Sequence, residues 1–205
     1  KRMEVAYLNQ NVRELEITKY VSLLMLDPMA LVRLQETGAC EFTIPEVLFD
    51  LDFSGHYFRR IKSVSISVPC VAGPYTSLNS TLTLLSSRVR IASTPVNRSY
   101  SDEQNFRQSS IPTQSIATST GQNDSGMFEL NFRDDRYLPF EGAGVISKWR
   151  FALPQALRPF DYSTITDVIL HVKYTARDGG SLRREPAQES LIDAGKTIGV
   201  DNSGF

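Results

Sequence analysis

Apolar and polar positions alternate with a period of two over much of the chain after about residue 60. In residues 63–68 every second residue is serine, and Val64, Ile66 and Val68 stand between the serines. This alternation predicts a strand with one apolar face toward a core and one hydroxyl-bearing face in polar surroundings. Further strands are predicted at residues 15–23, 40–44, 80–84, 88–91, 114–118, 127–133, 145–152 and 167–175.

Short strands separated by turn residues, with little helix after residue 51, are typical of an all-antiparallel architecture. We therefore predict a mainly β fold, an antiparallel β-sandwich-like domain with an N-terminal helix and one or two short helices. Ser86 and Ser87 interrupt the alternation between two predicted strands and indicate a bulge or bend there.

One short helix is predicted at residues 28–37. Asp27 can accept hydrogen bonds from the free N–H groups of the first turn, and Pro28 at the first helical position loses no hydrogen bond. Gly38 supplies a left-handed stop, so Leu31 and Leu34 are expected to point inward. A second brief helical turn is predicted at residues 46–51, after a proline.

The two ends of the chain differ from this middle. Residues 1–13 place Met3 and Tyr7 on one helical side, as expected for the end of a longer helix from a preceding domain. Residues 181–205 have few large apolar side chains and are predicted to form a C-terminal tail, a mostly exposed segment or helix. The β-rich domain is therefore predicted to span residues 14–180.

Composition narrows the classes of function. The 205 residues are 41% hydrophobic, with 22 Lys+Arg against 23 Asp+Glu, so the formal net charge is −1. This balance does not favour nucleic acid as a partner, because phosphate-binding domains normally have a basic excess. No apolar run approaches the length of about 20 residues that crosses a bilayer. Cys40 and Cys70 leave two alternatives open, one disulfide bridge or two buried thiols, of which the second is favoured.

Candidate catalytic chemistry is sparse. His171 lies on a predicted strand, where a hydrogen-bonded structural role is favoured, and His56 lies in a turn between elements. Two histidines and two cysteines, far apart, offer no metal-ligand spacing, and no phosphate-binding glycine loop occurs. We therefore predict no catalytic, cofactor-binding or metal-binding residues. A glycosidase, which would need two carboxylates, remains the enzymatic alternative.

Two aromatic and charged runs are predicted to have a structural role. Arg59 and Arg60 stand where a loop meets a strand, and we expect them to pair with carboxylates such as Asp50 or Asp52. The run at residues 132–140 is interpreted in the same way. The residues assigned to this structural motif are Gly55, His56, Tyr57, Arg59, Arg60, Tyr137 and Glu141.

Several longer runs resemble one known family. They are DFSGHYFRRIKSV at 52–64, PCVAGPYT at 69–76, NDSGMFELNF at 123–132, RYLPFEG at 136–142 and DVILHVKYT at 167–175. Together they are similar, in order over roughly residues 1–180, to the C-terminal B-component-binding domain of the Tc (toxin complex) toxin A subunit. Ser54 departs from the family, which usually has proline there, and this should alter a turn and leave the fold intact. The tail after Gly180 has no such match.

The resemblance implies a non-enzymatic docking domain of a secreted bacterial toxin complex. Its partner would be the β-propeller of the TcB component, so that the B–C container opens onto the channel of the pentameric A subunit. The resemblance also implies a homopentamer through the full-length A subunit, with membrane contact only through other domains. A carbohydrate-binding sandwich that attaches the toxin to host glycans is the alternative from another class, although its usual exposed aromatic row is missing from the serine-rich faces.

The polar stretch at residues 92–113 is predicted to be a long surface loop, and loops of this length are usually functional or disordered. Within it, Arg98, Tyr100, Phe106 and Arg107 are residue types favoured at binding hot spots, and we predict that they contact the partner. A surface loop without a partner is an equal alternative.

Overall fold

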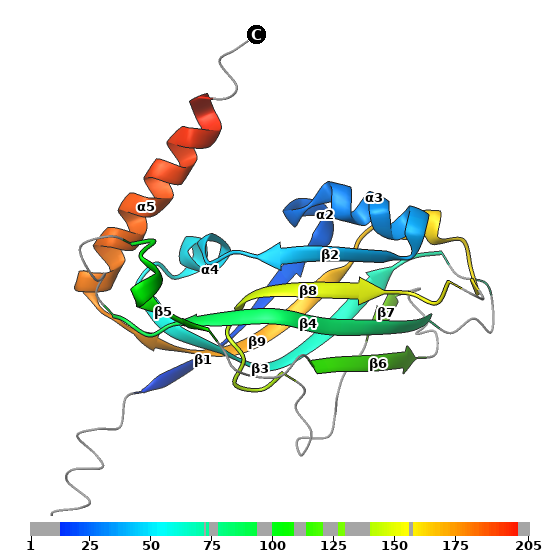
Figure 1. The fold of residues 1–205 in the computed structure, drawn as a ribbon, viewed down its shortest axis with the longest axis horizontal. Coiled ribbons are helices and arrows are strands. Elements are labelled where there is room, and N and C mark those ends of the chain that lie inside the picture. Colours follow the sequence, from blue (N-terminus) through cyan, green and yellow to red (C-terminus); the bar gives the residue numbers. More distant parts are fainter. Residues whose placement is uncertain are drawn as a thin grey trace, which may run out of the picture.

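The computed structural model describes residues 13–71, 73, 78–93, 100–108, 114–120, 127–129, 140–155 and 158–200. Two antiparallel sheets pack into a sandwich, with short helices beside one edge strand and at one end, and a longer helix in residues 181–200 (Figure 1). This confirms the predicted mainly β, antiparallel fold. The predicted N-terminal helix falls on residues 1–13, of which 1–12 lie outside the described residues.

The first sheet, called sheet A here, has the strand order β1-β9-β3-β7. Its strands are β1 (Glu14–Ser22), β9 (Ile169–Asp178), β3 (His56–Pro69) and β7 (Met127–Glu129). Strand β3 begins at His56, seven residues earlier than the alternation predicted. The register between β3 and β9 shifts twice near Arg60 and Lys62, so the regular two-residue pattern begins only at Ser63.

The second sheet, called sheet B here, has the order β2-β8-β4-β5, and β6 also pairs with β4. Its strands are β2 (Ala39–Ile44), β8 (Ile146–Ala152), β4 (Leu78–Arg90), β5 (Phe106–Gln108) and β6 (Gln114–Thr120). Strand β4 is one continuous strand where two were predicted. Its register with β8 shifts between Leu84 and Ser86, which confirms the predicted irregularity.

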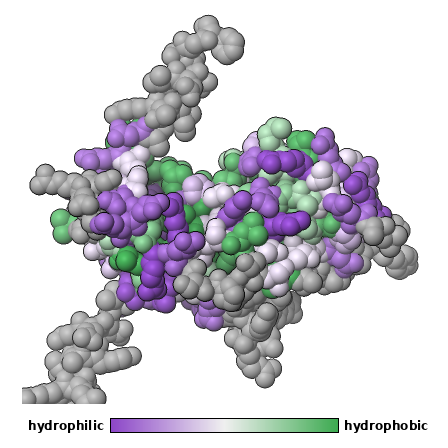
Figure 2. Space-filling view, viewed as in Figure 1, coloured by the Kyte–Doolittle hydropathy of each residue, from purple (hydrophilic) through white to green (hydrophobic). Residues whose placement is uncertain are grey.

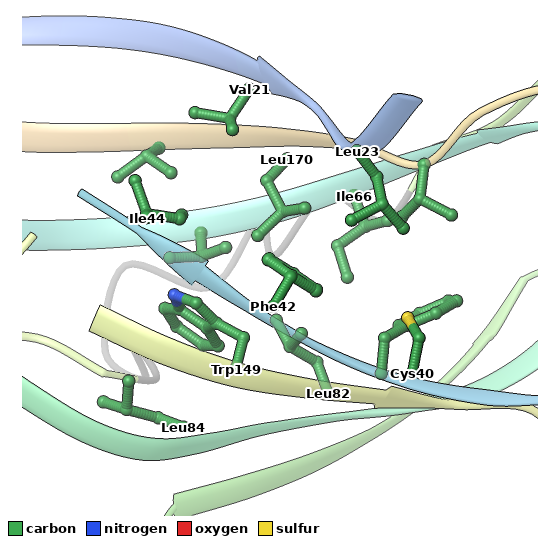
Figure 3. Packing of buried hydrophobic residues seen from close by; sticks show 14 of the residues in the cluster. Val21, Leu23, Cys40, Phe42, Ile44, Ile66, Leu82, Leu84, Trp149 and Leu170 are labelled. Carbon is green, nitrogen blue, oxygen red and sulfur yellow. The ribbon is translucent and has the colours of Figure 1, made fainter. Parts of the chain in front are cut away.

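The core lies between the two sheets. Phe42, Leu82 and Trp149 of sheet B point toward Ile66 and Leu170 of sheet A (Figure 3). Trp149 is fully buried, with its ring edge-on to Phe140 at 4.9 Å and its indole N–H donating to Ser147 Oγ at 2.7 Å. Burial of such aromatic and aliphatic side chains is the main force that holds the two sheets together.

Two short helices, α2 (Leu23–Leu26) and α3 (Pro28–Thr37), follow β1 and lie beside β2 (Figure 1). Asp27 accepts a hydrogen bond from the backbone N–H of Ala30, and Gly38 ends α3 with φ 75°. Leu31 and Leu34 are buried. The capping residues, the bounds of α3 and its inward face are therefore as predicted.

Helices α4 (Val47–Asp52) and α5 (Ser181–Val200) lie at one end of the sandwich, and α5 extends away from it (Figure 1). Within the segment predicted as a tail, Arg183 and Ala187 are buried. Both cysteines are free, with Cys40 buried and Cys70 half-buried. No described helix has the length and hydropathy needed to cross a membrane.

Candidate docking domain and its ionic cluster

The end of the sandwich beside α4 is closed by charged side chains. We call this group the ionic cluster, and its members are Glu46, Asp50, Arg59, Arg90, Tyr100 and Arg183. The three arginine side chains are at most 3% exposed. They come from β3, β4 and α5, so the cluster connects both sheets to the helices at this end.

Glu46 and Asp50 together pair with all three arginines. Arg90 binds Glu46 through two hydrogen bonds, with Nε–Oε1 at 2.8 Å and Nη2–Oε2 at 2.6 Å. Arg59 Nη2 binds Asp50 Oδ1 at 2.8 Å, and Arg183 Nη2 lies 3.2 Å from Glu46 and 3.5 Å from Asp50. Paired, hydrogen-bonded geometry of this kind is what allows charges to be taken out of water.

Tyr100 is the centre of this packing. Its ring packs against two guanidinium groups, with its centroid 4.1 Å from that of Arg90 and 4.6 Å from that of Arg183. Its hydroxyl donates to Asp50 and accepts from Arg183 Nη2 at 2.6 Å. Burial raises the pKa of both Tyr100 and Asp50, although Arg59 opposes the rise at Asp50. The hydroxyl thus stays protonated and able to donate.

Arg59 and Arg60 were both expected to pair with carboxylates such as Asp50 or Asp52. Arg59 pairs with Asp50 and also donates to the carbonyls of Phe49 and Phe53, so it holds α4 against β3. Arg60 instead binds Glu14 of β1 at 3.1 Å. Asp52 binds Lys19 of β1 and neither of these arginines. Of the pairings that were expected, the one between Arg59 and Asp50 is formed.

The glycine-histidine-tyrosine run lies beside the start of α5. The Gly55 carbonyl accepts a hydrogen bond from the Gly179 N–H at 2.9 Å. His56 stacks on Phe53 with ring centroids 4.8 Å apart, and burial lowers its pKa. Tyr57 is half-buried in β3. These contacts make the run part of the frame that positions α5.

The two remaining residues of the predicted motif are Tyr137 and Glu141. Tyr137 is outside the described residues. Glu141 is exposed in the turn that precedes β8, next to Gly142, which has φ 80°. Gly144 in the same turn approaches the backbone of β4 so closely that an added Cβ would lie 2.0 Å from the Arg88 carbonyl oxygen. The tight turn is needed because this segment bridges the two sheets through Arg60 and Gly144.

The predicted surface loop is only partly a loop. Residues 103–105 form a 3₁₀ turn and Phe106–Gln108 form β5 on the edge of sheet B. Phe106 packs against the guanidinium groups of Arg88 and Arg90 at 4.6 and 4.2 Å, and Asn105 is fully buried. The prediction of a continuous surface loop at 92–113 is thus wrong for this segment, because cation–aromatic packing holds it on the sheet.

The four residues predicted to contact the partner therefore have different environments. Tyr100 belongs to the ionic cluster, Phe106 is half-buried and Arg107 is exposed on β5. Arg98 lies outside the described residues. The structure brings Tyr100 and Phe106 together through Arg90, whereas Arg107 points to the surface.

Sequence reasoning missed three members of the cluster, namely Glu46, Arg90 and Arg183. Arg90 is the last residue of β4, and an arginine side chain at the end of a strand is usually expected to be exposed. Arg183 lies in the segment predicted to be a mostly exposed tail, so burial was not expected there. No pattern in the sequence specified which carboxylate each of these arginines binds.

Among the described residues, no group of three or more histidine, cysteine, aspartate or glutamate side chains could hold a metal ion. His171 Nε2 lies 2.9 Å from Ser67 Oγ, and its ring is edge-on to Tyr20. A shallow cleft of about 370 Å³ on the outer face of sheet B is lined by polar and apolar side chains together, including Arg88, Lys148 and Phe106. Hydrophilic and hydrophobic residues are interspersed over the face seen in Figure 2. A surface of mixed polarity over a packed sandwich is compatible with binding a protein.

Comparison with known proteins agrees with this class. The family model described as "Tc toxin complex TcA C-terminal TcB-binding domain" matches residues 1–176. The chain is 42% identical to the toxin subunit YenA2 of Yersinia entomophaga over 203 residues, which is 94% of this chain and 15% of that protein. Among solved structures, the Yersinia pseudotuberculosis TcaA-TcaB structure matches with a TM-score of 0.53 and 23% identity, over 86% of this chain and 10% of that one.

The chain therefore belongs to the family of TcB-binding domains found at the C-terminus of Tc toxin A subunits. The structural match supports the fold. The chain spans only 15% of the length of the curated relative that it matches.

Proposed function

We propose that this chain is the docking domain that binds the β-propeller of the B component. Docking opens the B–C container onto the channel of a pentameric A subunit, and the complex acts outside the bacterium. The domain contributes a surface and no catalysis. Membership of the TcB-binding family over residues 1–176 is the observation that carries this proposal.

The physical basis is a frame that does not deform when it binds. Both sheets share one core, and the ionic cluster fixes α4, β3, β4 and α5 to each other. A preorganised frame reduces the ordering cost of association. Repetition around an axis then raises the effective concentration of each further contact.

The surface that we propose for the partner includes β5 and the segment before it. Arg107 is exposed there, on a backbone held by the packing of Phe106 and Tyr100. Arg98, Tyr100, Phe106 and Arg107 remain the proposed contact set, but Tyr100 acts from the ionic cluster. Deleting the loop would therefore damage the frame, and a point substitution is the cleaner test.

The proposal is tested by adding the purified chain, alone and within the full-length A subunit, to the B–C assembly and measuring binding by biolayer interferometry. Binding is expected in both formats, more tightly for the full-length subunit, and absence of a complex in both would overturn the proposal. Arg107→Glu should weaken binding at least tenfold by placing a like or unpaired charge at the contact. Arg150→Glu, an exposed change on β8 of the same sheet, is the matched control and should bind normally.

A further inference from the structure

The ionic cluster holds more positive than negative charge. Arg59, Arg90 and Arg183 contribute three positive charges, and Glu46 and Asp50 contribute two negative ones, which leaves a net of +1. The arginines and Asp50 are buried and Glu46 is only 11% exposed, so little water reaches this excess. A charge taken out of water without a counter-charge is costly, because the interior solvates it poorly. The excess therefore favours a further negative group at this place.

The hydrogen bonds of the cluster leave several donors unused. Arg59 and Arg183 form their hydrogen bonds through Nη2, for example to Asp50 from Arg59 and to Glu46 and Tyr100 from Arg183. In the described part of the chain, no acceptor pairs with Nε or Nη1 of either arginine, and these four atoms are shielded from solvent. Buried N–H groups normally have an acceptor, so their position at a site of excess positive charge favours a bound anion.

A further unused donor lies at the same end of the sandwich. The Phe49 ring packs edge-on to Tyr174 with centroids 5.2 Å apart, and the Arg59 guanidinium lies 5.9 Å from the same ring. Tyr174 is fully buried, and its hydroxyl has no hydrogen-bond partner among the described residues. Burial raises the pKa of Tyr174 to about 12, so the hydroxyl stays protonated at neutral pH. The unused groups of Arg59, Arg183 and Tyr174 are therefore all donors, as an anion requires.

The position of Arg183 in α5 adds to the positive potential. Arg183 lies in the first turn of this helix, where the partial positive charge of the unpaired backbone N–H groups is concentrated. A cation is unfavourable there, whereas an anion is favoured. The helix end and the arginine thus favour the same kind of ligand.

A cavity of about 200 Å³ lies beside the cluster. Its lining includes Glu46, Asp50, Tyr100 and Ala187, and Ala187 is about one helical turn from Arg183. The cavity gives a small ion room next to the arginines. The two carboxylates in its wall repel negative charge, so a polyanion such as phosphate or sulfate is disfavoured relative to a small ion of single charge.

We propose that the ionic cluster binds one small monovalent anion of the chloride class, which accepts hydrogen bonds from Arg59 and Arg183. Its charge offsets the net of +1, and the Tyr174 hydroxyl is a third donor at this end. The bound ion completes the network that joins α4, β3, β4 and α5, so the folded chain is more stable when chloride is present. This property belongs to the frame of the domain and does not depend on B-component binding.

The first test compares the thermal unfolding midpoint of the 205-residue chain in potassium chloride and in potassium gluconate, whose anion is much larger. Ionic strength is held equal, so that screening is the same in both series. Above the dissociation constant, each tenfold rise in chloride should raise the midpoint by about 4 °C, because an ion that binds only the folded state stabilises it by mass action. A midpoint that is the same in both salts would overturn the proposal.

Two neighbouring residues of α5 provide a matched pair of variants. Arg183→Met removes the excess charge and one of the two arginines that hold the ion, so its midpoint should no longer depend on chloride. Arg184→Met removes an exposed cation from the next position, and it should respond to chloride as the unmodified chain does. A chloride response that survives in Arg183→Met, or that is lost equally in both variants, would contradict binding at the cluster.

A crystal of the unmodified chain soaked in sodium bromide gives a readout that needs no variant, because bromide replaces chloride and is located by its anomalous scattering. An anomalous peak is expected within hydrogen-bonding distance of Arg59 or Arg183. Ordered water alone at the cluster, or bromide found only on the protein surface as an adventitious ion only, would overturn the proposal.

Discussion

The core between the sheets and the ionic cluster at the end of the sandwich are both buried, yet they are held by opposite means. Around Trp149 the interior is apolar, and each contact contributes by removing surface from water. Around Arg59 the interior is charged, and its stability depends on each charge keeping its partner. In the apolar core, a substitution should lower the free energy of unfolding in proportion to the volume that it removes. In the ionic cluster, removing one partner of a buried charge pair should be enough to lower it.

The largest effect is expected from Trp149→Ala. This change leaves a cavity between Phe140 and the strands of sheet B, and truncation of a buried tryptophan costs about 4 kcal/mol. Urea unfolding followed by circular dichroism measures the change in the free energy of unfolding. Trp149→Phe, which keeps most of the ring volume, should recover more than half of that loss. A loss below about 1 kcal/mol for alanine would contradict the packing described here.

The next effect separates the two kinds of interior. Arg59→Met leaves Asp50 buried without its closest cation, and we expect a loss of about 3 kcal/mol although methionine preserves much of the volume. The neighbouring change Arg60→Met, at a pair that is partly exposed, should cost at most about 1 kcal/mol. Both are measured in the same urea titration. Equal losses at the two positions would show that burial of the pair is unimportant.

The smallest effect concerns the exposed side of sheet A and its dependence on pH. Burial raises the pKa of Glu14, but hydrogen bonding to Arg177 and the charges of Arg60 and Arg177 outweigh it, so the net pKa lies below the ordinary 4.5. Stabilisation by Glu14 is therefore complete above pH 4.5 and is lost as the pH falls through the lower folded-state value. At pH 7, Glu14→Gln should cost about 1 kcal/mol.

The difference between Glu14→Gln and the unmodified chain should narrow as the pH falls below 4.5, the ordinary pKa of the carboxyl, toward its lowered folded-state value. Thermal unfolding across a pH series from 3 to 7 measures it. Glu16→Gln, at the more exposed pair with Lys62, serves as the matched control and should have a smaller effect at neutral pH. A gap that stays constant over the whole series would show that the Glu14 carboxylate is not responsible.

Sequence alternation predicted the first kind of interior well and the second poorly. Val64, Ile66 and Leu82 lie inward because one-dimensional alternation maps directly onto the faces of a strand. Capping chemistry likewise predicted α3 from Asp27, because a cap is a local contact. Local rules are sufficient for these elements.

The ionic cluster has no such local rule. Its members come from α4, β3, β4, the segment at Tyr100 and α5, and they meet only after both sheets have formed. For the same reason the segment at 100–108 resembled an open loop, since Tyr100 and Phe106 are ordered by arginines from β4. The pairing of Arg59 with Asp50 was predicted as one of two options, because arginines where a loop meets a strand commonly bind nearby carboxylates, and the other option, Asp52, binds Lys19.

Alkylation of the free thiol of Cys40 can report local opening of the sandwich. Its side chain is 4% exposed between α3 and the sheet, and burial raises its pKa to about 11, so an alkylating reagent can reach a reactive thiolate only when this layer opens. Cys70 is only half-buried just after β3, so we expect it to react with less opening and to serve as an internal reference. The ratio of the two labelling rates therefore reports how often the sandwich loosens while the rest of the molecule remains folded.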